Sequence, residues 1–133
     1  MFPELSFHHI GIACHDIGRT VAFYEAMGYT AAPVVDDEVQ HVKVCFLDKH
    51  DAPRIELLEP LDDQSPVART LSTSGVSPYH LCYQVTDIDV AVKSLRSERF
   101  LLVSGPVPAV AMDDHRVAFL FKKDVGLIEL VEK

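Results

Sequence analysis

The stretch RIELLEPL at residues 54–61 has a near copy, LIELVEK, at residues 127–133. Each copy places a glutamate, Glu56 or Glu129, between an isoleucine and a leucine in an apolar run that is typical of a strand. Because side chains alternate between the two faces of a strand, each glutamate lies on the face opposite to its apolar neighbours. Packing alone gives no reason to repeat such a carboxylate, so the repeat indicates a functional position.

The two copies belong to a repeat that spans most of the chain. The two glutamates are 73 residues apart, and the same offset places VCFL at 44–47 on VAFL at 117–120. Further toward the N-terminus, HIGIACHDI at 9–17 matches HLCYQVTDI at 80–88 with an offset of 71 residues. The chain of 133 residues is therefore predicted to contain two copies of one unit of about seventy residues.

Each unit is predicted to run in the order βαβββ. Asp16 and Asp87 suit helix N-caps, because an aspartate side chain accepts hydrogen bonds from the first helical turn. Apolar residues follow both at helical spacing, and Gly28 suits the left-handed residue after the first helix. Further strands are expected near 30–35, 40–47 and 54–59 in the first unit and near 100–104, 115–121 and 126–131 in the second.

The expected fold class is α+β, with two tandem βαβββ modules that form a curled, metal-binding mixed sheet. We expect one domain over residues 1–133, with module one at about 5–60, a connector at about 61–77 and module two at about 78–133. Within the connector, Ser65 followed by Pro66 favours the start of a short helix, since proline is well suited to the first helical position.

Two histidines join the two glutamates as candidate metal ligands. His9 alternates with Ile10 on one expected strand, and His80 alternates with Leu81 on its repeat, so both imidazoles leave the face on which the helix packs. Four inward ionisable groups would be costly to bury without partners. One divalent ion bound by His9, Glu56, His80 and Glu129 resolves that cost, and the donor set suits Zn²⁺, Co²⁺, Ni²⁺ or Mn²⁺.

The paired motifs resemble the vicinal oxygen chelate superfamily, which includes glyoxalase I. They are HHIGIACHDI at 8–17 with FYEAMGY at 23–29, IELLEPL at 55–61, YHLCYQVTDI at 79–88, and RVAFL at 116–120 with GLIELVE at 126–132. QHVKVCFL, IELLEPLDDQSPVARTL and RVAFL are most similar to the methylmalonyl-CoA epimerase subfamily. The resemblance implies a glyoxalase-like fold, with metal ligands on the first and last strand of each module. In this sequence those ligand positions correspond to His9, Glu56, His80 and Glu129.

The resemblance also implies an activity. We expect a metal-dependent isomerase that moves an α-proton through a metal-stabilised enolate, with Glu129 as the catalytic base and an acyl-thioester as substrate. A glyoxalase I-type lactoylglutathione lyase, an iron dioxygenase and a non-catalytic small-molecule-binding protein of the same superfamily remain alternatives. PVPAVAMDDH at 106–115 and Phe121-Lys122-Lys123 differ from the epimerase pattern, which leaves the acyl group and its carrier open.

Bulk properties exclude several other classes. The net charge of −8 disfavours nucleic acid and anionic membranes as partners, and no apolar run is long enough to span a bilayer. The N-terminus lacks a signal-peptide pattern, and three widely spaced cysteines favour reduced thiols in a cytoplasmic protein.

Because half-sheets of this size expose edge strands, and because the family commonly forms dimers, a homodimer is expected.

Overall fold

The computed structural model describes residues 2–133 and divides the chain into two compact units. The first unit comprises His9–Tyr79, and the second comprises His80–Lys133 together with the N-terminal residues up to His8. The start of the second unit coincides with the histidine at which the sequence repeat begins again. The limits predicted for the two modules and their connector stay a prediction.

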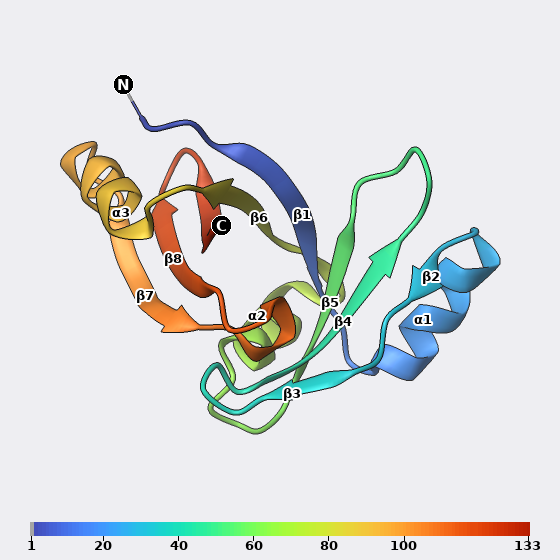
Figure 1. Ribbon diagram of the computed structural model, residues 1–133. Helices are drawn as coiled ribbons and strands as arrows, with labels where there is room; N and C mark the ends of the chain where they lie inside the picture. The colour runs from blue at the N-terminus through green and yellow to red at the C-terminus, as the bar shows by residue number, and fades with distance from the viewer. Residues whose placement is uncertain (1) are drawn as a thin grey trace. The chain divides into compact units, whose positions relative to one another are not determined.

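The first unit combines a mixed sheet with two helices (Figure 1). Its elements are the part of β1 (Ser6–Ala13) from His9 onward, α1 (Ile17–Ala26), β2 (Thr30–Ala31), β3 (Val35–Asp37), β4 (Val42–Asp48), β5 (Ile55–Pro60) and α2 (Pro66–Ser74). The strand order is β2-β4-β5-β1, and β3 also pairs with β4. Strand β5 is parallel to β1 and antiparallel to β4. The strand expected near 30–35 is divided into β2 and β3.

The second unit repeats this plan. Its elements are the part of β6 (Ser77–Val85) from His80 onward, α3 (Ile88–Ser97), β7 (Leu101–Pro108), the short 3-10 helix η1 (Val110–Met112), β8 (Arg116–Lys122) and β9 (Gly126–Glu132). The strand order is β6-β9-β8-β7, in which β6 is parallel to β9 and the other pairs are antiparallel. The predicted α+β class, with a mixed sheet and βαβββ modules, is confirmed.

Each unit has a core between its long helix and one face of its sheet. In the first unit, Ile17 of α1 packs with Leu47 and Leu57 of the sheet. In the second, Leu95 of α3 packs with Leu120. The apolar stripes predicted for both helices therefore face the sheet, as the sequence spacing requires.

Both long helices begin with the predicted aspartate cap. Asp16 Oδ1 accepts a hydrogen bond from the Arg19 N–H at 3.0 Å, and Asp87 Oδ1 accepts one from the Val90 N–H at 3.1 Å. The connector helix α2 begins at Pro66 as predicted, with the Ser65 side chain accepting from the backbone N–H of Val67. These caps satisfy N–H groups that have no partner within the helix.

A second acceptor at each helix start was not predicted. Glu59 Oε1 accepts from the Ile17 N–H at 2.8 Å, and Glu132 Oε2 accepts from the Ile88 N–H at 2.9 Å. The two glutamates are repeat-related, since each lies three residues after the glutamate of its IEL motif. A carboxylate at a helix N-terminus is also favoured by the helix dipole.

The second unit adds an ion-pair network to this contact. Arg116 lies within 3.1 Å of Glu132 and within 3.0 Å of Asp89. The hydrogen bond from Arg116 and then the one from the Ile88 N–H lower the pKa of Glu132 below its usual range. The acidic partners of Arg116 are 16 and 27 residues away along the chain, so no local sequence pattern indicates this network.

Replacing Glu132 with glutamine is expected to destabilise the protein by about 1–2 kcal/mol at pH 7, and Glu59→Gln by about 0.5–1 kcal/mol. The larger loss follows because Glu132 is held by Arg116 as well as by the helix start. Since the folded-state pKa of Glu132 is lowered, its stabilising contribution is present above pH 4.5 and is lost as pH falls through the lowered pKa. Urea unfolding at pH 7 and below pH 4 measures both effects; an equal loss in the two variants at pH 7 would contradict the role of Arg116.

Candidate metal centre

The first unit holds a buried histidine–glutamate pair. His9 lies on β1 and Glu56 on the parallel strand β5, where Glu56 is in register with Gly11, two residues along from His9 on the same face. His9 Nε2 and Glu56 Oε1 are 3.2 Å apart. The two residues are 0% and 3% exposed, so this ionisable pair lies inside the protein.

The second unit holds a matching pair. His80 lies on β6 and Glu129 on the parallel strand β9, in register with Cys82, again two residues along from the histidine. His80 Nε2 and Glu129 Oε1 are 3.1 Å apart, and the residues are 4% and 2% exposed. The structure therefore brings each predicted histidine together with the predicted glutamate of its own unit, in the same arrangement.

Both pairs lie on the sheet face away from the helices. Ile55 and Leu57, which flank Glu56, belong to the core under α1. Likewise, Leu130 belongs to the core under α3 and Ile128 packs against it, so Glu129 between them points the other way. The face predicted from strand alternation is confirmed in both units.

Two phenylalanines border the pairs and were not predicted as site residues. Phe46 is in register with Glu56 and meets the His9 ring edge-on, with ring centroids 5.3 Å apart. Phe119 is in register with Glu129 and meets the His80 ring in the same way at 5.1 Å. Their signal in the sequence was the repeated phenylalanine of VCFL and VAFL. Such edge-to-face contacts hold a ring in a defined orientation.

The donor set of each pair fits a borderline divalent cation. Two ligand atoms bound at right angles with bonds of ~2.1 Å lie ~3.0 Å apart, which is close to the separations seen in the two pairs. The same separations also suit a hydrogen bond between imidazole and carboxylate. Chemistry and burial distinguish these four residues, because each unit contributes one buried imidazole and one buried carboxylate.

Other candidate residues have structural roles. The three cysteines form no disulfides and are buried, and burial raises the pKa of the Cys14 thiol to about 11 and raises that of Cys45. These two thiols are therefore neutral at physiological pH, as packing residues are. His41 pairs with Asp62 at 2.9 Å on a partly exposed surface.

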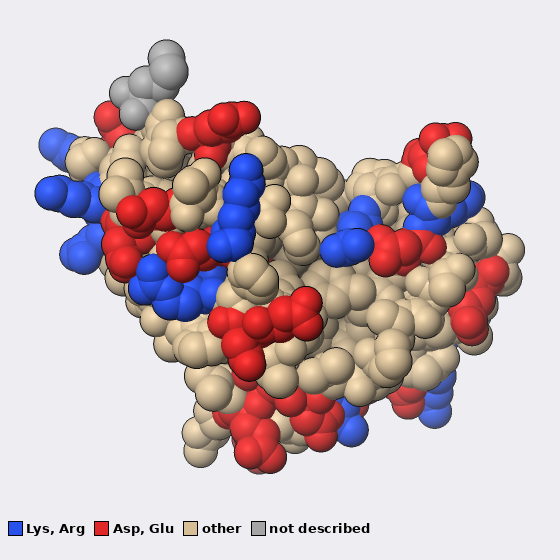
Figure 2. All heavy atoms as spheres, viewed as in Figure 1, with Lys and Arg blue, Asp and Glu red and all other residues tan. Residues whose placement is uncertain are grey.

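The surface is acidic and mixed in charge. Figure 2 shows acidic and basic side chains interspersed across the displayed face of the described residues, in keeping with the net charge of −8. Within residues 2–133, no helix is both long enough and apolar enough to cross a bilayer.

Comparison with known families assigns the chain to a class. Residues 8–119 match the family model described as the Glyoxalase/Bleomycin resistance protein/Dioxygenase superfamily. The chain belongs to this superfamily, as its motifs predicted.

Several individual relatives of the chain are methylmalonyl-CoA epimerases. The chain is 30% identical to the mitochondrial methylmalonyl-CoA epimerase of Dictyostelium discoideum, covering 95% of this chain and 77% of that protein. It is 31% identical to an ethylmalonyl-CoA/methylmalonyl-CoA epimerase of Cereibacter sphaeroides, covering 92% and 94%. A methylmalonyl-CoA epimerase variant of Streptomyces coelicolor, solved in complex with 2-nitronate-propionyl-CoA, is 31% identical with a TM-score of 0.83, covering 98% and 99%.

Proposed function

We propose that the protein is a metal-dependent isomerase that epimerises an acyl-CoA thioester by transferring its α-proton. The observation that supports this most is the duplicated buried pair of histidine and glutamate, one in each unit. We further propose that His9, Glu56, His80 and Glu129 together bind one divalent ion per chain, as the resemblance to the family implies.

The charge of the ligand set supports a divalent ion. Two neutral imidazoles and two carboxylates carry a total charge of −2, which one divalent cation neutralises. Nitrogen and carboxylate oxygen ligands suit Zn²⁺, Co²⁺, Ni²⁺ and Mn²⁺. When bound, such an ion acts as a Lewis acid that stabilises negative charge developing on the thioester carbonyl oxygen.

Glu129 is proposed as the base. Its carboxylate accepts the proton from the α-carbon, and the electron pair of the broken C–H bond moves into the enolate. Return of a proton derived from solvent to the opposite face of the α-carbon gives the epimer, and Glu129 then releases the proton that it accepted to solvent. A positioned carboxylate of this kind contributes about 10²–10⁴-fold to the rate.

Proton exchange with solvent tests the proposed reaction. Methylmalonyl-CoA incubated with the metal-loaded protein in deuterated water is expected to incorporate deuterium at its α-carbon, as measured by mass spectrometry. Exchange of ethylmalonyl-CoA would show whether a larger acyl group is accepted. Exchange of the hemithioacetal of glutathione and methylglyoxal would show whether the carrier is glutathione instead of CoA. Exchange of the hemithioacetal alone would assign the protein to the glyoxalase I-type reaction, in which the proton returns to the neighbouring carbon.

A binding protein and an iron dioxygenase of the same superfamily are the remaining alternatives. Absence of exchange with all three compounds, with the metal site loaded, would contradict the isomerase proposal and favour a binding protein. An iron dioxygenase is less consistent with the chain, because Glu56 would take a position that two histidines and one carboxylate leave open for oxygen.

Assembly and location are part of the proposal. β2 ends the strand order of the first unit and β7 ends that of the second, and natural proteins cover or pair such edges. We therefore expect a homodimer with a twofold interface, and a monomer in light scattering at micromolar concentration would contradict it. Buried cysteines without disulfides favour a reducing compartment, so a cytoplasmic location is expected.

A further inference from the structure

The strand positions next to the two histidine–glutamate pairs differ in chemistry between the units. With the repeat offset of 73 residues, Arg54 corresponds to Leu127, and Asp48 corresponds to Phe121. The first unit therefore has two charged residues where the second unit has two large apolar ones. Comparison of these positions indicates what each unit offers to a ligand held at its pair.

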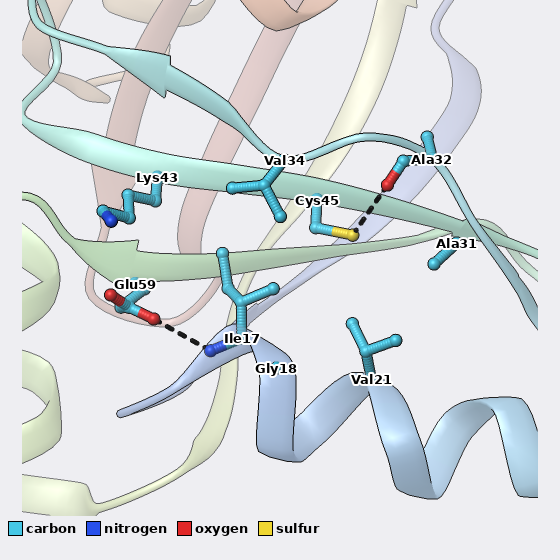
Figure 3. Close-up of a pocket in the computed structure, with 9 residues that line it drawn as sticks. All are labelled: Ile17, Gly18, Val21, Ala31, Ala32, Val34, Lys43, Cys45 and Glu59. Atoms are coloured by element: carbon cyan, nitrogen blue, oxygen red, sulfur yellow. Dashed lines mark hydrogen bonds between the residues drawn. The ribbon is translucent and has the colours of Figure 1, made fainter.

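The two faces of the sheet in the first unit carry different residues. Figure 3 shows a pocket against α1, and Lys43, Cys45 and Glu59 line it on the helix side of β4 and β5. Because side chains alternate along a strand, Phe46 and Glu56 lie on the opposite face. Even-numbered positions of β4 and β5 therefore mark the face of the candidate metal ligands.

On that face, the first unit has an ion pair. Arg54 Nε donates a hydrogen bond to Asp48 Oδ1 at 2.8 Å, and the guanidinium lies over the Phe46 ring, 5.7 Å from its centroid. Phe46 in turn contacts the His9 ring. The charges of Arg54 and Asp48 neutralise each other, and an alkyl group placed here would strip water from both.

The second unit has a row of apolar side chains at the equivalent place. Phe121 is in register with Leu127 on one side and with Leu101 on the other. Leu127 lies two residues from Glu129 on β9, and Phe121 lies two residues from Phe119 on β8, so all three side chains share the face of Glu129. We call Leu101, Phe121 and Leu127 the apolar row.

The apolar row is open to solvent. Leu101 is 66% exposed, Phe121 is 42% exposed, and Leu127 is half-buried. A contiguous exposed apolar patch is typical of an interaction site. Three side chains are far fewer than the roughly 20–30 residues that each partner contributes to a stable protein interface. The size of the row therefore suits part of a small molecule.

Strand register places the row directly beside the second histidine–glutamate pair. Leu81 is in register with Ile128, so one residue earlier on both strands Leu127 lies beside His80. Adjacent strands are about 4.8 Å apart, and Phe121 lies one strand beyond Leu127. An alkyl chain that leaves a substrate held at this pair therefore meets Leu127 first and Phe121 next.

We propose that the apolar row binds the alkyl group on the α-carbon of the substrate, and that the protein prefers 2-alkylmalonyl thioesters with alkyl groups longer than methyl. This inference rests on the proposed function and names its substrate class. Leu127 and Phe121 are the specificity-determining residues. One alkyl site serves both epimers, because epimerisation changes the face that carries the proton and leaves the alkyl group in place.

A series of 2-alkylmalonyl-CoA thioesters with methyl, ethyl, propyl and butyl groups tests the proposal on the natural protein loaded with Co²⁺. The kcat/KM for exchange of the α-proton with deuterated water is expected to rise about threefold per methylene, because each added methylene leaves water on the row. Isothermal titration calorimetry with the same thioesters measures their Kd without reference to turnover, and the Kd is expected to fall in the same order.

The two measurements separate this inference from the proposed function. Exchange of all four thioesters with equal kcat/KM would retain the isomerase and overturn the alkyl site. Absence of exchange with every thioester would contradict the proposed function, and the Kd values alone would then decide on the alkyl site. Kd values that are equal, or that rise from methyl to butyl, would overturn it.

Variants of the row identify the residues that contact the alkyl group. Phe121→Ala is expected to lower the ratio of butyl to methyl kcat/KM at least about threefold, whereas Phe121→Leu, which keeps an apolar side chain, retains most of the ratio. Phe23→Ala is the matched control, because Phe23 is a 74% exposed aromatic residue on α1 of the first unit. This control is expected to leave the ratio unchanged. An unchanged ratio in folded Phe121→Ala would refute recognition by Phe121.

A change of charge gives an independent test. Leu127→Arg carries the residue of the first unit into the row and is expected to reverse the preference, so that methylmalonyl-CoA becomes the best substrate and the tightest ligand of the series. Metal content is measured alongside, since Leu127 lies beside His80. A retained preference for butyl in the metal-loaded variant would overturn the proposal.

A second copy of the chain is the alternative occupant of the row. In that case Phe121→Ala would raise the dimer dissociation constant in light scattering and leave the ratio of butyl to methyl unchanged. That pair of results would assign the row to an interface and contradict the alkyl site.

Discussion

Replacing Glu129 with glutamine is expected to abolish α-proton exchange from an acyl-CoA thioester into deuterated water. The substitution keeps the shape of the side chain but removes the carboxylate that is proposed to accept the proton. A loss of about 10²–10⁴-fold is expected from removal of a general base. Mass spectrometry of the recovered thioester at saturating metal measures the exchange rate directly.

Glu56→Gln provides the matched control, because Glu56 occupies the same position of the other unit. Its carboxylate lies 3.2 Å from His9, as that of Glu129 lies 3.1 Å from His80. If Glu129 is both ligand and base while Glu56 is a ligand only, Glu56→Gln retains a measurable part of the exchange when metal content is matched. Equal losses in the two variants would assign no separate base role to Glu129.

Removal of either buried histidine is expected to weaken metal binding by at least about 100-fold, since the loss of a direct ligand exceeds the 10–100-fold typical of outer partners. His9→Ala tests the first unit, and His80→Ala tests the second. If both pairs share one ion, the two variants lose affinity to a similar extent. Competition of Co²⁺ with a chromophoric chelator measures the dissociation constants without reference to activity.

His50→Ala is the control for this comparison, because the His50 side chain is 96% exposed. It is expected to leave Co²⁺ affinity unchanged. Circular dichroism of all three variants checks that the fold is retained. Retention of full affinity in either folded variant, His9→Ala or His80→Ala, would remove that residue from the metal site.

Much of the fold could be predicted from local sequence signals. Asp16, Asp87 and Ser65 precede helices that begin where the capping pattern places them. The division of the strand expected near 30–35 into β2 and β3 was missed, because that segment pairs with β4 in two separate places. Alternation along a single segment carries no information about where a partner strand ends.

The candidate site was found because the chain repeats itself. One histidine on a strand does not by itself indicate a metal ligand. The repetition of His9 as His80 and of Glu56 as Glu129 indicates that the same strand positions carry candidate ligands in both units. Contacts across long sequence separations were not accessible in this way. The Glu132–Arg116 pair and the glutamate at each helix start depend on strand register and helix packing, which appear only once the units are folded.

The apolar row was likewise invisible in the sequence. Leu101, Phe121 and Leu127 are ordinary strand residues when read singly, and they belong to three different strands. Only strand register shows that the three lie side by side on the face of Glu129.

Metal content per chain tests the central claim most directly, namely that two repeat-related pairs hold one ion. Equilibrium dialysis of the purified protein against Co²⁺ or Zn²⁺, followed by elemental analysis, is expected to give one tightly bound ion per chain, reduced to none in both His9→Ala and His80→Ala. Two equivalents per chain, with one retained in each variant, would show that the pairs bind separately. No tightly bound ion in the natural protein would mean that the pairs are hydrogen-bonded core residues and would contradict the account.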